Sequence, residues 1–370
     1  QVKTLGFQAT LQPMPDFTIQ LTAQRSTTSN FSEVIRFDPA ADAYAFDTPI
    51  RNGNYNISFM SIGTAFSKND SRNNSSLFDD FIQYRSDMKT TLDGLNENGT
   101  YQLSSQDVMI PAFIAAYTGK SPTKTSAFPR IPLPNWKVTF SGLSKLEKFK
   151  NVLRSFSIDH AYTSTYSIGN YTSSLLYNGN FVGLGVSEYD IPLPTFDPLT
   201  NELVPVLVMS QVSIIERFAP FLGVNLRTKS DVTVRVAYNK QRSLMLNLSN
   251  AQVTELKNND ITLDVGFKKK KVKVPFSDYV LENDLTFRLA FTLRDTRTLQ
   301  RKITEDNLQE TTVTNGNLNW QFKPTLSYMV NKTVDLTAYF ERTVNSPLIS
   351  NSFRRSNTNF GVQIRINLAQ

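Results

Sequence analysis

The sequence predicts an all-β protein: a transmembrane antiparallel β-barrel, forming part of a very large barrel, with a small helical insertion. Apolar and polar residues alternate over much of the C-terminal half, as in strands whose two faces meet different surroundings. Charged residues make up only 19% of the chain and aromatic residues 11%, a composition that suits a wall in contact with lipid. No apolar run approaches the roughly 18 residues of a membrane-spanning helix, so passage through a bilayer would require strands.

In the N-terminal half we predict long strands over residues 16–26, 56–68 and 157–168. Their alternation is less regular than that of the later strands. In the third segment, tyrosines and serines blur the distinction between an apolar and a polar face.

A helical insertion is predicted for residues 76–119, as an ordered or plug-like loop between barrel strands. Residues 77–92 place apolar side chains near helical spacing, which predicts a first helix. A second short helix is expected after Asp107, with Pro111 near its start, where proline is tolerated, and Gly119 as its terminator.

The C-terminal half carries the clearest alternation. We predict strands over residues 231–239 and 243–249, separated by a tight polar turn at residues 239–242. Further strands are expected over residues 260–268 and 284–294. The last of these matches the roughly 9 to 11 residues that a tilted strand needs to cross a bilayer.

A hairpin of residues 320–330 and 333–342 follows, with a two-residue turn between its strands, and residues 360–370 form the final strand. Residues 296–317 and 343–357 are predicted to be long polar loops. Short turns at one end of the strands and long loops at the other are the layout of outer-membrane barrels.

The alternation assigns side chains to two faces. The face expected to line a hydrated lumen of mixed charge, with no tight hold on cargo, carries six candidates: Arg235, Asn247, Arg288, Arg294, Asp335 and Arg365. The face expected to contact lipid carries seven: Val234, Leu246, Leu263, Phe287, Leu289, Leu336 and Ile364.

No catalytic constellation is found, so we predict no enzymatic activity, no cofactor and no metal site. The chain has no cysteine, which removes disulfides, thiolate ligands and cysteine nucleophiles together. Its single histidine, His160, lies in a strand-like tract, where a structural role is expected. The net charge is +7, but the only dense basic run, residues 268–271, is interpreted as a strand end or loop, so no nucleic-acid partner is expected.

Six segments from about residue 107 onward carry a resemblance to a known family. They are IPAFIAAYTG (110–119), LPNWKVTFSGL (133–143), HAYTSTYS (160–167), ERFAPFLG (216–223), RSLMLNLSN (242–250) and NTNFG (357–361). These segments are similar to the C-terminal part of the SprA/Sov family, the outer-membrane translocon of the type IX secretion system in Bacteroidetes.

The resemblance implies an outer-membrane channel that exports folded cargo proteins from the periplasm, including gliding-motility adhesins. It implies a lipid bilayer, a PorV-type shuttle protein, a plug protein, periplasmic ring or motor components and cargo with a C-terminal sorting domain as partners. Family members are much longer than 370 residues, so residues 1–370 are expected to be the C-terminal part of one transmembrane barrel domain. The remaining strands of the same barrel would complete the wall, in the outer membrane of a Gram-negative bacterium.

Two other classes remain open. A self-standing porin or small-solute channel would use about a dozen strands and would need residues 1–10 to pair with the final strand. A soluble surface β-sandwich adhesin would instead bury the apolar face as its core and would be released from membranes by alkaline carbonate.

Overall fold

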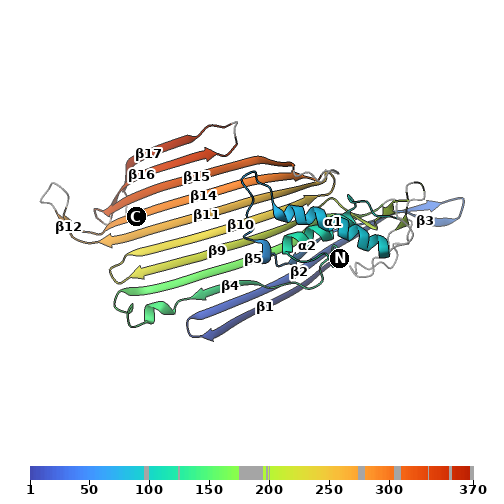
Figure 1. Cartoon of the computed structure of the whole chain (residues 1–370). Coiled ribbons are helices and arrows are strands. Elements are labelled where there is room, and N and C mark those ends of the chain that lie inside the picture. Colours follow the sequence, from blue (N-terminus) through green and yellow to red (C-terminus); the bar gives the residue numbers. More distant parts are fainter. Residues whose placement is uncertain are drawn as a thin grey trace.

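The computed structural model describes residues 1–95, 100–123, 126–174, 195–196, 199, 201–273, 280–303, 310–331, 333–349 and 352–366. Figure 1 shows one broad sheet of long strands, with two helices on one face near one end of the strands. Within these residues, thirteen strands form a single sheet in which all strand pairs are antiparallel. The prediction of a mainly antiparallel β protein with few helices is confirmed.

The strands of this sheet are β1 (Val2–Met14), β2 (Phe17–Asp38), β3 (Ala43–Ser58), β4 (Asn135–Phe140), β5 (Leu153–Ser173), β8 (Leu207–Met209), β9 (Gln211–Thr228), β10 (Thr233–Asn247), β11 (Gln252–Lys269), β14 (Leu285–Lys302), β15 (Glu310–Met329), β16 (Val334–Pro347) and β17 (Arg355–Ile366). Two small sheets pair β6 (Thr195–Phe196) with β7 (Leu203–Val204) and β12 (Val272–Lys273) with β13 (Val280–Leu281). The helices are α1 (Ser76–Leu95) and α2 (Gln106–Thr118), with 3-10 turns at Ile62–Thr64 and Gly142–Lys145.

The strand order in space follows the chain: β1-β2-β3-β5-β9-β10-β11-β14-β15-β16-β17. β4 pairs with β2 and β5 beyond the end of β3, so β3 and β4 share one position between those two strands. This order has eleven strands, each running opposite to its neighbour, so the first and the last, β1 and β17, run in the same direction. In the described part of the chain, each of these two edge strands pairs on one side only.

The strands are much longer than the five or six residues of an ordinary strand. β2 has 22 residues, β5 has 21 and β15 has 20. At about 3.3 Å per residue, such strands extend roughly 65–70 Å, about twice the roughly 30 Å hydrocarbon core of a bilayer. We call the end of the sheet near Asn247 the helical end, because α1 and α2 pack there, and the opposite end the far end.

Several predicted boundaries were wrong in the same direction, because strands continue where turns or loops were expected. Residues 239–242 are not a turn: β10 runs through them and pairs with β11 without a register shift. In the predicted loops 296–317 and 343–357, most of the described residues are strand, since β14, β15, β16 and β17 extend into them. Residues 304–309, 350 and 351 of these loops lie outside the described residues, as do residues 367–370 of the predicted final strand. Conversely, the predicted strand 56–68 ends at Ser58 and gives way to a 3-10 turn.

The two helices were predicted correctly. α1 covers the expected residues 77–92, and its buried side chains include Phe78, Phe81 and Met88. α2 contains Pro111 and ends at Gly119, which adopts the left-handed conformation with φ 70°. Glycine suits this position because it has no Cβ to clash in that conformation.

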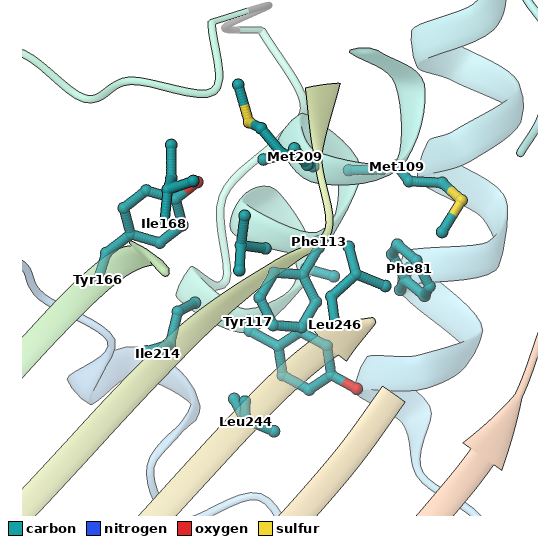
Figure 2. Close-up of a cluster of buried hydrophobic side chains, with 14 of the residues drawn as sticks. Phe81, Met109, Phe113, Tyr117, Tyr166, Ile168, Met209, Ile214, Leu244 and Leu246 are labelled. Atoms are coloured by element: carbon teal, nitrogen blue, oxygen red, sulfur yellow. The ribbon is translucent and has the colours of Figure 1, made fainter. Parts of the chain in front are cut away.

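The main hydrophobic core lies between the helices and the helical end of the sheet. Figure 2 shows Phe113 and Tyr117 of α2 directed toward Leu244 and Leu246 of β10, with Ile214 of β9 beside them. All five side chains are fully buried or nearly so. The helices therefore pack as a second layer over the helical end of the sheet, and this layer does not extend to the far end.

Candidate functional site

One face of the sheet is polar, and the strand registers bring the six predicted lumen residues together on it. Arg235 lies opposite Asp264 and Arg294 opposite Asp260, while Asp335 lies opposite Arg365. Arg288 and Asn247 occupy the same face, because each is an even number of residues from one of these positions on its own strand. The pairing thus groups all six on one side, although lumen exposure itself stays a prediction.

The polar face is hollowed into shallow depressions of mixed charge. One of them, of about 670 Å³, is lined by Lys137, Asp159, Arg217, Arg235 and Asp260 among others. Two of its acidic groups accept hydrogen bonds from neighbouring amides: Asn239 donates to Asp260 at 2.8 Å, and Asn225 donates to Asp159 at 2.8 Å.

Two further depressions lie on the same face. One of about 600 Å³ contains Arg288 and Lys323, and one of about 460 Å³ contains Asp335, Arg365 and Lys268. Charges of both signs alternate along the surface, so water and weak transient contacts suit it better than one tightly bound ligand.

The opposite face carries a continuous zone of apolar side chains, which we call the apolar band. It spans residues 285–293 of β14 and 320–328 of β15, about 26 Å along each strand at about 3.3 Å per residue. The registers place six predicted lipid-facing residues in this band: Val234, Leu263, Phe287, Leu289, Leu336 and Ile364. Contact with lipid remains a prediction for all of them.

The seventh predicted lipid-facing residue, Leu246, is corrected by the structure. It shares the face of Val234, but its side chain is fully buried beneath α2. The alternation of apolar and polar residues identifies the face of a strand on which a side chain lies, but it does not predict what covers that face.

The apolar band ends abruptly on the side toward the helical end. Its last row, running across four paired strands, consists of Tyr238, Ile261, Leu293 and Trp320. At the next same-face position along three of those strands stand Lys240, Asn259 and Asp295, whereas the fourth strand, β15, carries Leu318 there. The boundary therefore combines a row that contains two aromatic residues, Tyr238 and Trp320, with a mainly polar row. Aromatic residues also flank the hydrophobic zone of outer-membrane barrels.

The helices lie on the side of the apolar band, because Leu244 and Leu246 beneath them share the face of Val234. The expected plug-like role of residues 76–119 would require them on the polar face. Their position therefore does not favour a plug in a lumen lined by the polar face.

Between the band and the helices lies a first buried ion pair that sequence reasoning missed. Glu216 contacts Arg242 at 3.1 Å, and Ser61 and Tyr162 both donate to the Glu216 carboxylate, at 2.8 and 2.9 Å. Arg242 also donates to the carbonyl and hydroxyl oxygens of Thr64, both at 2.8 Å. The pair fastens the segment before α1 to β9 and β10.

A second buried pair lies on the neighbouring strands. Arg301 donates to Glu255 at 2.9 Å and to the carbonyl oxygen of Asn73 at 3.3 Å, and Lys257 lies 3.2 Å from Glu255. Burial alone would raise the pKa of Glu255, but the positive charges of Lys257, Arg301 and Arg242 outweigh burial and lower that pKa. The only sequence signal for either pair is an ionisable residue at an otherwise apolar position of a strand.

The remaining site expectations concern chemistry. His160 lies in β5 with its Nδ1 2.6 Å from the carbonyl oxygen of Phe221, a backbone contact. Among the described residues, no three side chains of the His, Cys, Asp or Glu type converge on a possible metal position. Of the helices in those ranges, none combines the length and hydropathy that a membrane span needs. No protein-family model and no curated protein matches this sequence.

Proposed function

We propose that this sheet is a section of the wall of a large outer-membrane β-barrel, with the apolar band toward lipid and the polar face toward a conduit. The observation that carries the proposal is an apolar band that no second layer covers in the described residues. Ile261, Phe322 and Leu326 lie on inner strands and still keep 40%, 36% and 41% of their surface exposed. A soluble β-sandwich would cover such residues with a second sheet, so this alternative is disfavoured.

The direction of the edge strands favours a larger wall over a self-standing porin. Closing this sheet on itself would pair β17 with β1, and that pair would be parallel. Bacterial outer-membrane barrels of one chain have antiparallel strands in even number. An odd number of additional strands between β17 and β1 would restore both conditions, which supports the remaining strands of the same barrel as partners.

For transport, we propose export of folded proteins from the periplasm, in the manner of the type IX translocon. The support is the similarity of six segments to the SprA/Sov family, together with a polar face whose mixed charges offer no tight binding site. On this proposal the chain resides in the outer membrane of a member of the Bacteroidetes. A PorV-type shuttle, a plug protein and periplasmic ring or motor components cooperate with it, and cargo with a C-terminal sorting domain passes through.

The first test compares two arginine substitutions on one strand. Leu289→Arg places a charge in the apolar band and should cost about 2–4 kcal/mol if that position lies near the bilayer midplane. Thr292→Arg places the same charge on the polar face, in the depression of about 670 Å³, and should be mild. The readout is the amount of protein retained in carbonate-washed outer membranes, and equal losses from the two variants would refute the face assignment.

A second test separates a translocon from a porin. An immunoblot of those membranes with an antibody against residues 357–370 should show a band several times heavier than the 41.8 kDa of this chain. Depletion should trap cargo in the periplasm and leave small-solute uptake unchanged. A band near 42 kDa with altered uptake and normal secretion would favour the porin instead.

A further inference from the structure

The segment between β3 and α1, residues 62–74, lies on the sheet at the boundary of the apolar band. Phe66 contacts Phe218 and Phe221 of β9, with ring centroids 5.5 and 5.4 Å apart. The Nζ of Lys240 lies 4.3 Å from the centroid of the Phe66 ring. Lys240 belongs to the mainly polar row next to the last apolar row, so Phe66 lies at the level where the band ends.

Phe66 is unusually exposed for an aromatic residue in a ring cluster. It keeps 49% of its surface accessible, while Phe218 beneath it is fully buried. Ala65 next to it is also buried, against Tyr162 and Phe218. The backbone is thus fixed to the sheet, and the aromatic ring projects outward on the same side as the band.

A recess of about 310 Å³ lies between the sheet and the residues that follow Phe66 in this segment. Its cations are Lys68, Lys257 and Arg297, and its acids are Asp70 and Asp295. The acids are already engaged, because Asp70 accepts from the backbone of Arg72 and Asn74, both at 2.8 Å, and Asp295 accepts from Arg297 at 3.2 Å.

The cations differ in how far they are satisfied. Lys257 donates to Asn69 at 3.1 Å and lies near Glu255. Lys68 is exposed and makes no hydrogen bond or ion pair within the described ranges. Phe66 thus lies at the end of an apolar zone, with the ammonium group of Lys240 over its ring and the unpaired, exposed Lys68 two residues further along the segment. This combination matches the chemistry of the lipid interface, where aromatic rings lie near headgroup level and lysines reach phosphates.

We propose that segment 62–74 rests on the headgroup layer of the membrane, with Phe66 at the boundary of the acyl chains and Lys68 contacting lipid phosphate. This inference rests on the proposed function, because it needs the apolar band to face lipid. It makes the helical pair a membrane-surface element on the outside of the wall. The parts of the strands that extend beyond the bilayer are then covered by α1 and α2, and segment 62–74 connects these helices to the lipid surface.

Residues 1–370 contain no cysteine. Single-cysteine labelling of the protein, with any cysteine outside these residues replaced, therefore gives a direct test. A fluorophore is attached at Phe66→Cys, and the protein is placed in vesicles of phosphatidylcholine and phosphatidylglycerol. The vesicles carry nitroxide quenchers either on the headgroup or deep in the acyl chain. Matched controls are Leu263→Cys in the band, Thr292→Cys on the polar face and Asp87→Cys on the exposed side of α1.

We expect headgroup nitroxides to quench the label at residue 66 most strongly, acyl nitroxides to quench the label at 263, and neither to quench labels at 292 or 87. If 263 is quenched but 66 behaves like 87, the inference is overturned and the wall proposal stands. If 263 itself escapes the acyl quencher, the wall proposal fails and takes the inference with it.

The proposed contact between Lys68 and lipid phosphate is tested separately by substitutions of Lys68. Lys68→Glu should cause a loss of headgroup quenching at residue 66, and Lys68→Arg should preserve it. Unchanged quenching in Lys68→Glu would refute the role assigned to Lys68, even if the ring lies at the interface.

Discussion

The buried pair of Arg301 and Glu255 gives the sharpest test of how the helical layer is held. Arg301 has no exposed surface, and its guanidinium joins Glu255 of β11 to the carbonyl oxygen of Asn73, just before α1. Replacing it by glutamine leaves a buried carboxylate without its closest cation. Loss of one partner of a buried pair costs about 3–5 kcal/mol.

For Arg301→Gln, the expected loss of stability lies near the lower end of that range. Lys257 remains 3.2 Å from Glu255 and still compensates part of its charge. The lost hydrogen bond to Asn73 adds about 1 kcal/mol. We therefore expect Arg301→Gln to lower the opening free energy of residues 62–75 by about 3–4 kcal/mol, which is a loss of hydrogen-exchange protection of a few hundredfold.

Hydrogen exchange of the purified protein in a non-ionic detergent measures this change. Arg297→Gln is the matched control, because Arg297 lies on the same strand and face but is 49% exposed, and its contact with Asp295 should be worth at most about 1 kcal/mol. Equal small effects from both variants would refute the structural role of the buried pair. The double variant with Glu255→Gln should recover part of the loss, since it removes the stranded charge.

Three further expectations use the same exchange measurement or a simple assembly assay. Leu246→Ala should lower protection of α2 by about 2–5 kcal/mol, because it opens a cavity under that helix, whereas Met245→Ala on the opposite face should have a smaller effect. Gly53→Ala should block assembly, because its Cβ would lie 1.9 Å from a carbonyl oxygen of β2, while Gly6→Ala meets nothing within 4 Å and should assemble normally. Burial raises the pKa of Asp107 from 3.8 to about 6, so the folded state keeps a proton that the unfolded state has lost between these values. Protection of α2 should therefore fall as pH rises from about 4 to 6, by at most about 3 kcal/mol, and Asp107→Asn should abolish this dependence; protection that rises with pH would contradict it.

Much of the fold could be predicted because strand period and helix spacing are local properties. The alternation in β10 and β11 identified both faces, and the end of α2 was marked by Gly119. The lengths of the strands could not be predicted in the same way. A strand that passes from an apolar to an aqueous zone loses its alternation of hydropathy, so residues 239–242 resembled a turn although the backbone ladder continues.

The sequence was sufficient to assign side chains to the two faces of the sheet. It was not sufficient to predict which parts of a face the helices cover. All six polar candidates share one face because parity along each strand survives the pairing. Leu246 was misassigned because the residues that cover it belong to helices more than a hundred positions earlier in the chain. The buried Glu216 and Arg242 were missed for the same reason, since burial of charge depends on distant partners.

The uninterrupted ladder between β10 and β11 also has a mechanical meaning. Its fifteen residue pairs run from Thr233 to Asn247 without a bulge, so this pair of strands resists bending along its whole length. Flexibility is expected where the register shifts, at residues 159–162 of β5 and 218–222 of β9, because bulges bend a strand. If the sheet is the proposed wall of a conduit, a change in the width of that conduit would start as bending along β5 and β9, with β10 and β11 moving together.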